Sequence, residues 1–289
     1  MTTQRIEPKV CHAQANGLRL HYVDWGEAGN PPMVLLHGFS AQARYWDGFA
    51  VHMRDAYHVY ALDQRGHGDS DWSSEYGPTT MPADLAALVD QLGLERFTLI
   101  GHSMGGGVAF RYTADHPDRV ERLIIEDAAL PSPDRPPVLN PDNSVQRALA
   151  KDIFADEEEV VAHLMRQSPG VGEERIRQVI PQWYRRLEDG RFTFKFDPAL
   201  RSRLRGAADP EEHRRSAIEL REKLRRFTRP VLLVRGEKSD ILSAEAAQET
   251  VAAFPDATLV SIPGAGHNVH VESPRAFRAA VRDWLGVGA

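Results

Sequence analysis

The sequence contains only one cysteine, Cys11, among its 289 residues. A lone thiol cannot form a disulfide within the chain, so the fold needs no covalent cross-link. No apolar run is long enough to cross a bilayer, and the opening residues MTTQRIEPKVCHAQANG lack the apolar stretch of a secretory signal. These absences argue against a disulfide scaffold and a membrane protein, and we expect a cytoplasmic location.

Motifs for metal and nucleotide chemistry are also missing. The HExxH and P-loop patterns do not occur, and PGAGHNV near the end of the chain has only two glycines of a dinucleotide fingerprint. The net charge is −6, and the basic-looking stretch HRRSAIELREKLRRFTRP also carries Glu219 and Glu222 at helical spacing. This spacing favours a solvated helix face over a nucleic-acid patch. We expect no metal, cofactor, nucleic-acid or membrane partner.

Short apolar segments alternate with helical patterns along most of the chain. Their continuous hydrophobicity is typical of strands buried on both faces, and the alternation predicts a doubly wound α/β domain with a mostly parallel sheet. The expected strands are 33–38, 58–63, 97–101, 122–127, 231–236 and 258–264, and the expected helices are 81–93, the segment after Ser103, 243–254 and 274–285. A hairpin is expected before them, because CHAQA and LRLHYVDW flank the turn dipeptide Asn16-Gly17.

One long interval interrupts this alternation. About a hundred residues rich in proline, arginine and helical patterns separate RLIIED from VLLVRG. A structureless loop of that length is implausible in a compact domain. We therefore expect a core domain from residues 1–128 and 230–289, with a helical cap inserted at 129–229 over the sheet edge.

The stretch FTLIGHSMGGGVAF contains the pattern G-x-S-x-G at residues 101–105, between a predicted strand and a predicted helix. In a nucleophile elbow the serine occupies a sharp turn, and the glycines let neighbouring backbones approach closely. The pattern alone occurs by chance in roughly one chain in ten of this size. The pattern indicates a nucleophile only in combination with the other motifs of the chain.

Five motifs in order carry a resemblance to the α/β-hydrolase family over nearly the whole chain: HGF (37–39), DQRGHGDS (63–70), GHSMGG (101–106), RGEKSD (235–240) and GAGHNVHVESP (264–274). The chain is similar to the cap-bearing soluble branch, which includes esterases, lactonases, C–C bond hydrolases and cofactor-free perhydrolases. A serine at the elbow, rather than an aspartate, argues against epoxide hydrolase and dehalogenase chemistry. A carbonyl electrophile is expected instead.

The resemblance implies a catalytic triad in the chain order Ser…Asp…His. Ser103 needs a base within hydrogen-bond reach, and His267 lies in the glycine-bracketed loop after the last strand, which favours it over His270. Two carboxylates satisfy the order for the residue that orients the histidine. Asp240, which follows VLLVRG, is the expected acid, and Asp127, next to Glu126 at the end of an earlier strand, is the alternative.

Acyl transfer also requires donors for the oxyanion, and we expect the backbone N–H groups of Phe39 and Met104. Phe39, Met104 and Trp183 are candidate pocket residues. The expected function is a serine hydrolase that cleaves a small-molecule ester or lactone, as a monomer or homodimer. A C–C bond hydrolase or perhydrolase with the same triad, or a slow-turnover ligand-sensing protein, remains an alternative.

Overall fold

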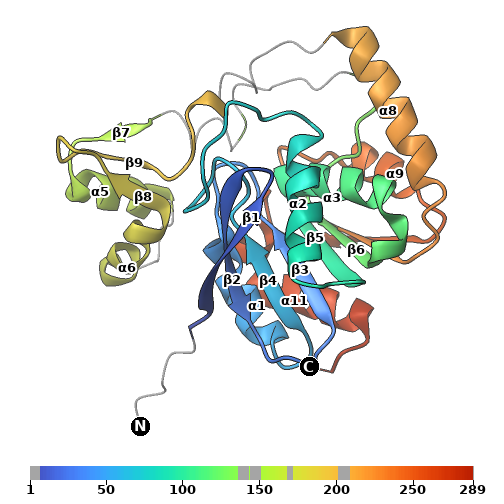
Figure 1. Cartoon of the computed structure of the whole chain (residues 1–289), viewed down its shortest axis with the longest axis horizontal. Coiled ribbons are helices and arrows are strands. Elements are labelled where there is room, and N and C mark those ends of the chain that lie inside the picture. Colours follow the sequence, from blue (N-terminus) through green and yellow to red (C-terminus); the bar gives the residue numbers. More distant parts are fainter. Residues whose placement is uncertain (1–6, 136–142, 144–150, 168–171, 201–208, 289) are drawn as a thin grey trace.

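In the computed structural model of the chain, the described residues are 7–135, 143, 151–167, 172–200 and 209–288, without the side chains of Gln167 and Arg175. Most of them belong to one α/β unit built on an eight-stranded sheet with the order β1-β2-β4-β3-β5-β6-β10-β11 (Figure 1). β1 pairs antiparallel with β2, β2 pairs antiparallel with β4, and the other pairs are parallel. The strands are β1 Lys9–Ala15, β2 Leu18–Trp25, β3 Pro32–Leu36, β4 His58–Leu62, β5 Phe97–His102, β6 Val120–Glu126, β10 Val231–Gly236 and β11 Ala257–Ile262.

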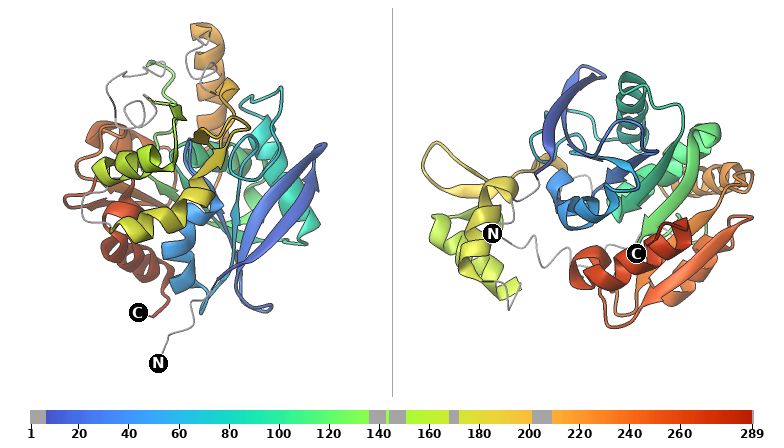
Figure 2. Two further views of the ribbon diagram at one scale, coloured as in Figure 1. Left: turned by 90° about the vertical axis from the view of Figure 1, so that its left-hand side faces the viewer. Right: turned by 90° about the horizontal axis from the view of Figure 1, so that it is seen from below.

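Helices cover both faces of this sheet, as the view from below makes plain (Figure 2). One face packs on α2 Thr80–Gln91, α3 Met104–Asp115, α8 Pro210–Leu224 and α9 Ala244–Val251. The other packs on the 3₁₀ turn Ala43–Trp46, α1 Asp47–Met53 and α11 Pro274–Leu285. Side chains alternate between the two cores along each strand: Val34 and Leu36 of β3 face the first, and Met33 and Leu35 face the second. This double burial explains why the strand segments are continuously apolar.

The prediction of a doubly wound, mostly parallel sheet is confirmed. Each of the six expected core strands is present with ends within two residues of those predicted, and the helix expected at 274–285 has those bounds. The hairpin is also confirmed, because Asn16 and Gly17 adopt φ of 51° and 80° between β1 and β2. Positive φ at both central residues is the type I′ geometry that matches the twist of paired strands.

The described part of the segment between β6 and β10 lies in two places. A small antiparallel sheet, β7 Ile153–Phe154, β9 Phe192–Phe194 and β8 Tyr184–Arg186, packs with α5 Glu157–Gln167 and α6 Glu173–Trp183 around a core of its own. Helix α8 instead lies against α3, on the other side of the molecule in Figure 1, and its Leu220 and Leu224 join the main core. Among the described residues of this segment, α5, α6 and α8 are longer than the three strands, and the small sheet was not predicted.

Backbone contacts join the small sheet to the core loop after β4. The N–H of Gly68 donates to the carbonyl of Lys195 at 2.7 Å, and the N–H of Asp197 donates to the carbonyl of Gly66 at 2.7 Å. The Tyr76 hydroxyl donates to Asp197 Oδ2 at 2.5 Å. The guanidinium of Arg65 in this loop binds both carboxylate oxygens of Asp84 in α2. The motif DQRGHGDS therefore has a structural role: it fixes the loop after β4 and anchors the small sheet to it.

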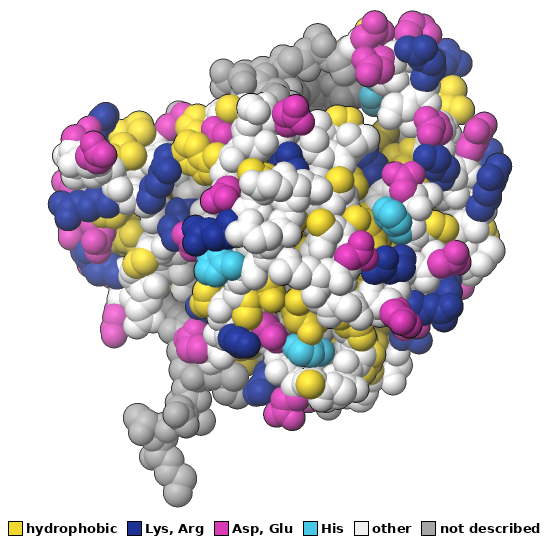
Figure 3. Space-filling model, viewed as in Figure 1, with side chains coloured by type: hydrophobic (Ala, Val, Ile, Leu, Met, Phe, Trp, Pro, Cys, Tyr) yellow, Lys and Arg dark blue, Asp and Glu magenta, His cyan; other side chains and the backbone are white. Residues whose placement is uncertain are grey.

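Charges of both signs are intermixed over the face seen in Figure 3. No helix in the described part of the chain has the length and apolar character needed to span a membrane.

Candidate active site

Ser103 occupies the turn between β5 and α3. Its backbone adopts φ 51° and ψ −113°, a strained conformation for a residue with a side chain. Two glycines make the turn possible: a Cβ on Gly101 would lie 2.4 Å from the carbonyl oxygen of Gly105, and one on Gly105 would lie 2.6 Å from that of Leu36. The sharp turn thus depends on close backbone contact on both sides, and it places the serine at the carboxyl end of the sheet.

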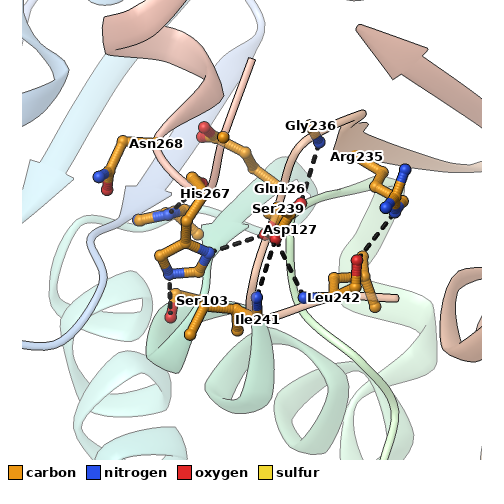
Figure 4. A network of polar contacts seen from close by, with 12 residues as sticks. Ser103, Glu126, Asp127, Arg235, Gly236, Ser239, Ile241, Leu242, His267 and Asn268 are labelled. Carbon is orange, nitrogen blue, oxygen red and sulfur yellow. Dashed lines mark hydrogen bonds and ion pairs between the residues drawn. The ribbon is translucent and has the colours of Figure 1, made fainter. Parts of the chain in front are cut away.

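Three side chains form a continuous hydrogen-bonded relay beginning at this serine. The Nε2 atom of His267 lies 3.0 Å from the Ser103 hydroxyl oxygen, and its Nδ1 lies 2.7 Å from Asp127 Oδ2 (Figure 4). Because a carboxylate can only accept, Nδ1 carries the proton and Nε2 is free to accept the serine proton. Ser103 and His267 are brought together as predicted.

Asp127 follows the last residue of β6 and is fully buried. Its φ of 47° turns the chain there, while its N–H donates to the carbonyl of Val234 at 2.8 Å. Beyond His267, its carboxylate accepts the N–H of Gly236 at 3.0 Å and the hydroxyl of Ser239. These fixed donors hold the carboxylate in one orientation, and the carboxylate in turn fixes the tautomer of His267.

The expectation that Asp240 lies against His267 is therefore wrong, and Asp127 takes that place. Asp240 is exposed in the turn after β10, beyond the strand end at Gly236. The residue of this turn that reaches the relay is Ser239, whose oxygen also accepts the N–H groups of Ile241 and Leu242. The signal that favours Asp127 is its position immediately after a strand, next to the strand that carries the nucleophile.

Two buried histidines, His37 and His102, support the loops around the relay. His37 Nε2 accepts the N–H of Gln64 at 3.0 Å, so its Nδ1 carries the proton and donates to the carbonyl of Gly38 at 2.7 Å. His102 Nε2 lies 3.2 Å from the carbonyl oxygen of His267. Burial lowers the pKa of His102 to about 3. His102 is thus a neutral donor that holds the backbone of His267.

The two expected oxyanion donors flank the serine. Met104 is the first residue of α3, where an N–H has no acceptor within the helix. Phe39 follows β3, and among the described residues its N–H makes no hydrogen bond. Gly38 lies so close to His102 that a Cβ would be 2.6 Å from the ring. The loop before Phe39 is therefore pressed against the nucleophile strand.

A second histidine–carboxylate pair lies beside the relay. His270, the rival of His267 in the sequence, contacts Glu126 instead of the serine, with Nδ1 at 2.8 and 2.9 Å from the two carboxylate oxygens. Burial would raise the pKa of Glu126, but the contacts with His270 outweigh it and lower that pKa. Glu126 is therefore an anion inside the protein.

Aromatic rings surround the site on the side of the small sheet. Tyr45 makes edge-to-face contacts with Trp183 at 5.1 Å and His270 at 4.5 Å between ring centroids, and Phe39 lies 5.5 Å from Phe196. Burial raises the pKa of the Tyr45 hydroxyl, with Glu126 and Glu272 adding to the effect, so it stays protonated. Trp183, expected as a pocket residue, lies at the end of α6 where the two units meet.

One group of described residues has the spacing of metal ligands. Ligand atoms of His21, Asp63 and Asp69 lie within 4.8 Å of one another. Each of these residues already has protein partners. His21 Nδ1 lies 2.7 Å from Asp63 Oδ2, and this oxygen also accepts the N–H of Asp69. The Asp69 carboxylate pairs with Lys195. These contacts account for the cluster as part of the loop after β4.

The fold and the serine elbow define the class of protein. The family described as alpha/beta hydrolase fold matches residues 31–274, and the chain belongs to that family. It is accordingly a hydrolase enzyme.

Individual relatives cover almost the whole chain. It is 29% identical over 269 residues to 2-(acetamidomethylene)succinate hydrolase of Mesorhizobium japonicum, covering 90% of each chain. It is 28% identical to an sn-1-specific diacylglycerol lipase of Mus musculus, covering 90% of this chain and 82% of the relative. Among solved structures, a thioesterase domain from the curacin biosynthetic pathway superposes with a TM-score of 0.78 at 23% identity, over 96% of this chain and 99% of that one. The last likeness concerns the fold alone.

Proposed function

We propose that the protein is a serine hydrolase that cleaves a carboxylic ester or lactone through an acyl-enzyme. The observation that carries the proposal is the relay from Ser103 through His267 to the buried carboxylate of Asp127, at 3.0 and 2.7 Å. A serine hydroxyl is a weak nucleophile until a base accepts its proton. Here the base is aligned and in the tautomer that can accept.

The chemistry follows from this alignment. Ser103 Oγ attacks the carbonyl carbon while its proton passes to His267 Nε2, and the Asp127 carboxylate stabilises the imidazolium. The backbone N–H groups of Met104 and Phe39 receive the developing oxyanion. His267 then gives the proton to the departing alkoxide, and the acyl group remains on Ser103. Water, deprotonated by the same histidine, releases the acid and restores the serine.

The surroundings of the relay support an uncharged, largely apolar substrate. The rings near it come from Phe39, Tyr45, Trp183 and Phe196, contributed by both the core and the small sheet. Such walls bind acyl or alcohol groups by burial of apolar area. Lipase chemistry in the name of the Mus musculus relative is consistent with a carbonyl substrate of this kind.

The name of the Mesorhizobium relative supports a second candidate, hydrolysis of an acidic succinate derivative. The relay serves either substrate, since both present a carbon electrophile to the serine. The two differ in charge near the site: a dicarboxylate requires cationic partners, whereas aromatic walls favour a neutral group. A comparison of neutral and dicarboxylate substrates of equal size therefore separates them.

The first experiment is turnover of p-nitrophenyl esters from acetate to octanoate by the wild type and by Ser103→Ala. We expect sustained turnover that falls by about 10³-fold or more in the variant, because triad members act as a unit. The acyl chain length that is hydrolysed fastest indicates the size of the acyl-binding site. Activity that survives Ser103→Ala would refute the mechanism. Slow, near-stoichiometric turnover would favour a ligand-sensing role.

A further inference from the structure

The buried pair formed by Glu126 and His270 has no part in the proton relay, yet it adjoins every member of it. Glu126 is fully buried and His270 is 6% exposed. Besides the ring contact, one carboxylate oxygen of Glu126 accepts the backbone N–H of His270 at 2.8 Å. The glutamate thus binds both the side chain and the backbone of His270, the second residue of the helical turn α10, Val269–Glu272.

The pair is locked by its neighbours. The His270 ring stacks on Trp46 at 4.2 Å with 20° between the planes, and Tyr45 meets it edge-on. The His102 ring lies 5.5 Å from that of His270 and 4.7 Å from that of His267. Burying a carboxylate is costly unless it is well paired, and here His270 is the partner that the buried Glu126 requires.

Glu126 also contacts the nucleophile turn through its backbone. Its carbonyl oxygen accepts the N–H of Ser103 at 3.0 Å, and the next residue, Asp127, holds the ring of His267. Two consecutive residues at the end of β6 therefore contact the serine turn, the base and the loop that carries the base. A displacement at Glu126 would be transmitted to all three.

We propose that Glu126 is a positioning residue, which, together with His270, fixes the loop that presents His267 to Ser103. This inference rests on the proposed serine hydrolase function. The loop between β11 and α10 is held from its other side by Glu272, whose carboxylate accepts the N–H groups of Gly266 and Asn268, on either side of His267. Glu272 is exposed, so the buried Glu126 supplies the rigid support.

The test uses a fluorophosphonate probe, which labels an activated serine whatever the natural substrate is. Glu126→Gln keeps an acceptor for the His270 N–H but removes the charge, and Glu126→Ala removes both. We expect labelling of Ser103 to slow about 10-fold in the first and about 100-fold in the second, since a misplacement of about 1 Å can have the larger effect. If Glu126→Ala does not fold, Glu126→Gln carries the test.

Asp24→Asn is the matched control. Asp24 pairs with His58 Nε2 at 2.7 Å, but His58 begins β4, at the opposite end of the sheet from the relay. Loss of this pair should lower the thermal midpoint without slowing the labelling. It thereby separates general destabilisation from positioning.

A second readout reports the geometry without any reaction. The proton between His267 Nδ1 and Asp127 should give a downfield proton NMR signal, which we expect to shift or broaden in Glu126→Gln and to stay in place in Asp24→Asn. A folded Glu126→Gln that labels within twofold of the wild type and keeps the signal would overturn the proposal. If the wild type is not labelled, the serine hydrolase function fails, and the NMR signal alone decides the positioning role.

Discussion

The backbone conformation of Asp127 decides which carboxylate reaches His267. A φ of 47° bends the chain immediately after β6, so that the side chain points along the sheet edge toward the loop after β11. Asp240 lies in a turn further from its strand, and Ser239 of that turn only supports the carboxylate. The strain at Asp127 is offset by three donors, from Gly236, Ser239 and His267.

Separate substitutions of the two aspartates test this assignment. Asp127→Asn should reduce kcat/KM for a p-nitrophenyl ester by about 10³- to 10⁴-fold, because an amide no longer fixes the tautomer of His267 or stabilises its charge. Asp240→Asn should remain within about twofold of the wild type, as expected for an exposed residue. The reverse pattern would restore Asp240 as the acid.

Sequence reasoning located Ser103 and His267 but not the partner of the histidine. The serine is identified by glycines that only a close backbone approach explains, and the histidine by its place after the last strand. The two aspartates follow neighbouring parallel strands, and motif order fits both. The choice depends on which side chain turns inward, and this is set by a φ angle and by Ser239, neither of which a one-dimensional pattern encodes.

At the scale of elements, the contact between α3 and the sheet depends on glycine in the first turn of the helix. A Cβ at Gly105 would lie 2.6 Å from the carbonyl oxygen of Leu36 and 2.7 Å from that of His37. Backbone atoms in the middle of a sheet cannot move aside easily. A Cβ at Gly107, two residues further along the helix, would have only the end of the Arg111 side chain near it, at 3.6 Å.

Alanine at these two positions should therefore have opposite effects. We expect Gly105→Ala to lower the free energy of unfolding by about 2 kcal/mol or more through overlap with the β3 backbone. Gly107→Ala should raise it by about 0.5–1 kcal/mol, because alanine favours a helix interior. Urea denaturation of both variants measures this. Equal effects would mean that α3 can move away from the sheet.

The helices and strands differ in how well their sequences predict them. The buried strands and the helices of the core have strong periodicity, and Asn16-Gly17 encodes its own turn. The small sheet has strands of only two or three residues, held by cross-strand packing of Phe154, Tyr184 and Phe194. Pairing of this kind joins residues far apart in the chain, so local patterns do not reveal it.

For the whole molecule, buried neutral histidines predict sensitivity to acid. Burial lowers the pKa of His67 and of His102 to about 3, whereas an unfolded histidine titrates near about 6.5. Between these values the unfolded chain binds more protons than the folded one. The stability that neutral histidines provide is therefore complete above about pH 6.5 and is lost as the pH falls toward 3.

Denaturation at a series of pH values tests this. Each of the two histidines should add about 1.4 kcal/mol of unfolding free energy per pH unit between about pH 4 and 6. His67→Asn should remove one such contribution from the slope, whatever it does to the absolute stability. A slope that is the same in the variant and the wild type would show that His67 is protonated in the folded state.

The doubly wound architecture could be predicted because it follows from repeated local signals and from the chirality of parallel strands. The arrangement of the segment between β6 and β10 could not. Its α8 belongs to the main core through Leu220 and Leu224, while its other described elements form a separate core. Which helix packs where depends on the surface of the segment and on the surface of the core domain. The sequence of the segment alone carries no information about the core surface.

The place of Asp127 has a consequence for how the activity is distributed along the chain. Ser103 and Asp127 both precede the segment between β6 and β10, and His267 follows it. A break anywhere in that segment would leave two fragments, one with the serine and the acid but neither the base nor the donors that orient the acid, the other with a base but nothing to activate. The enzyme is thus a candidate for a split reporter. Each fragment alone would be inactive, and activity would return only when two interacting proteins, each fused to one fragment, bring the fragments together.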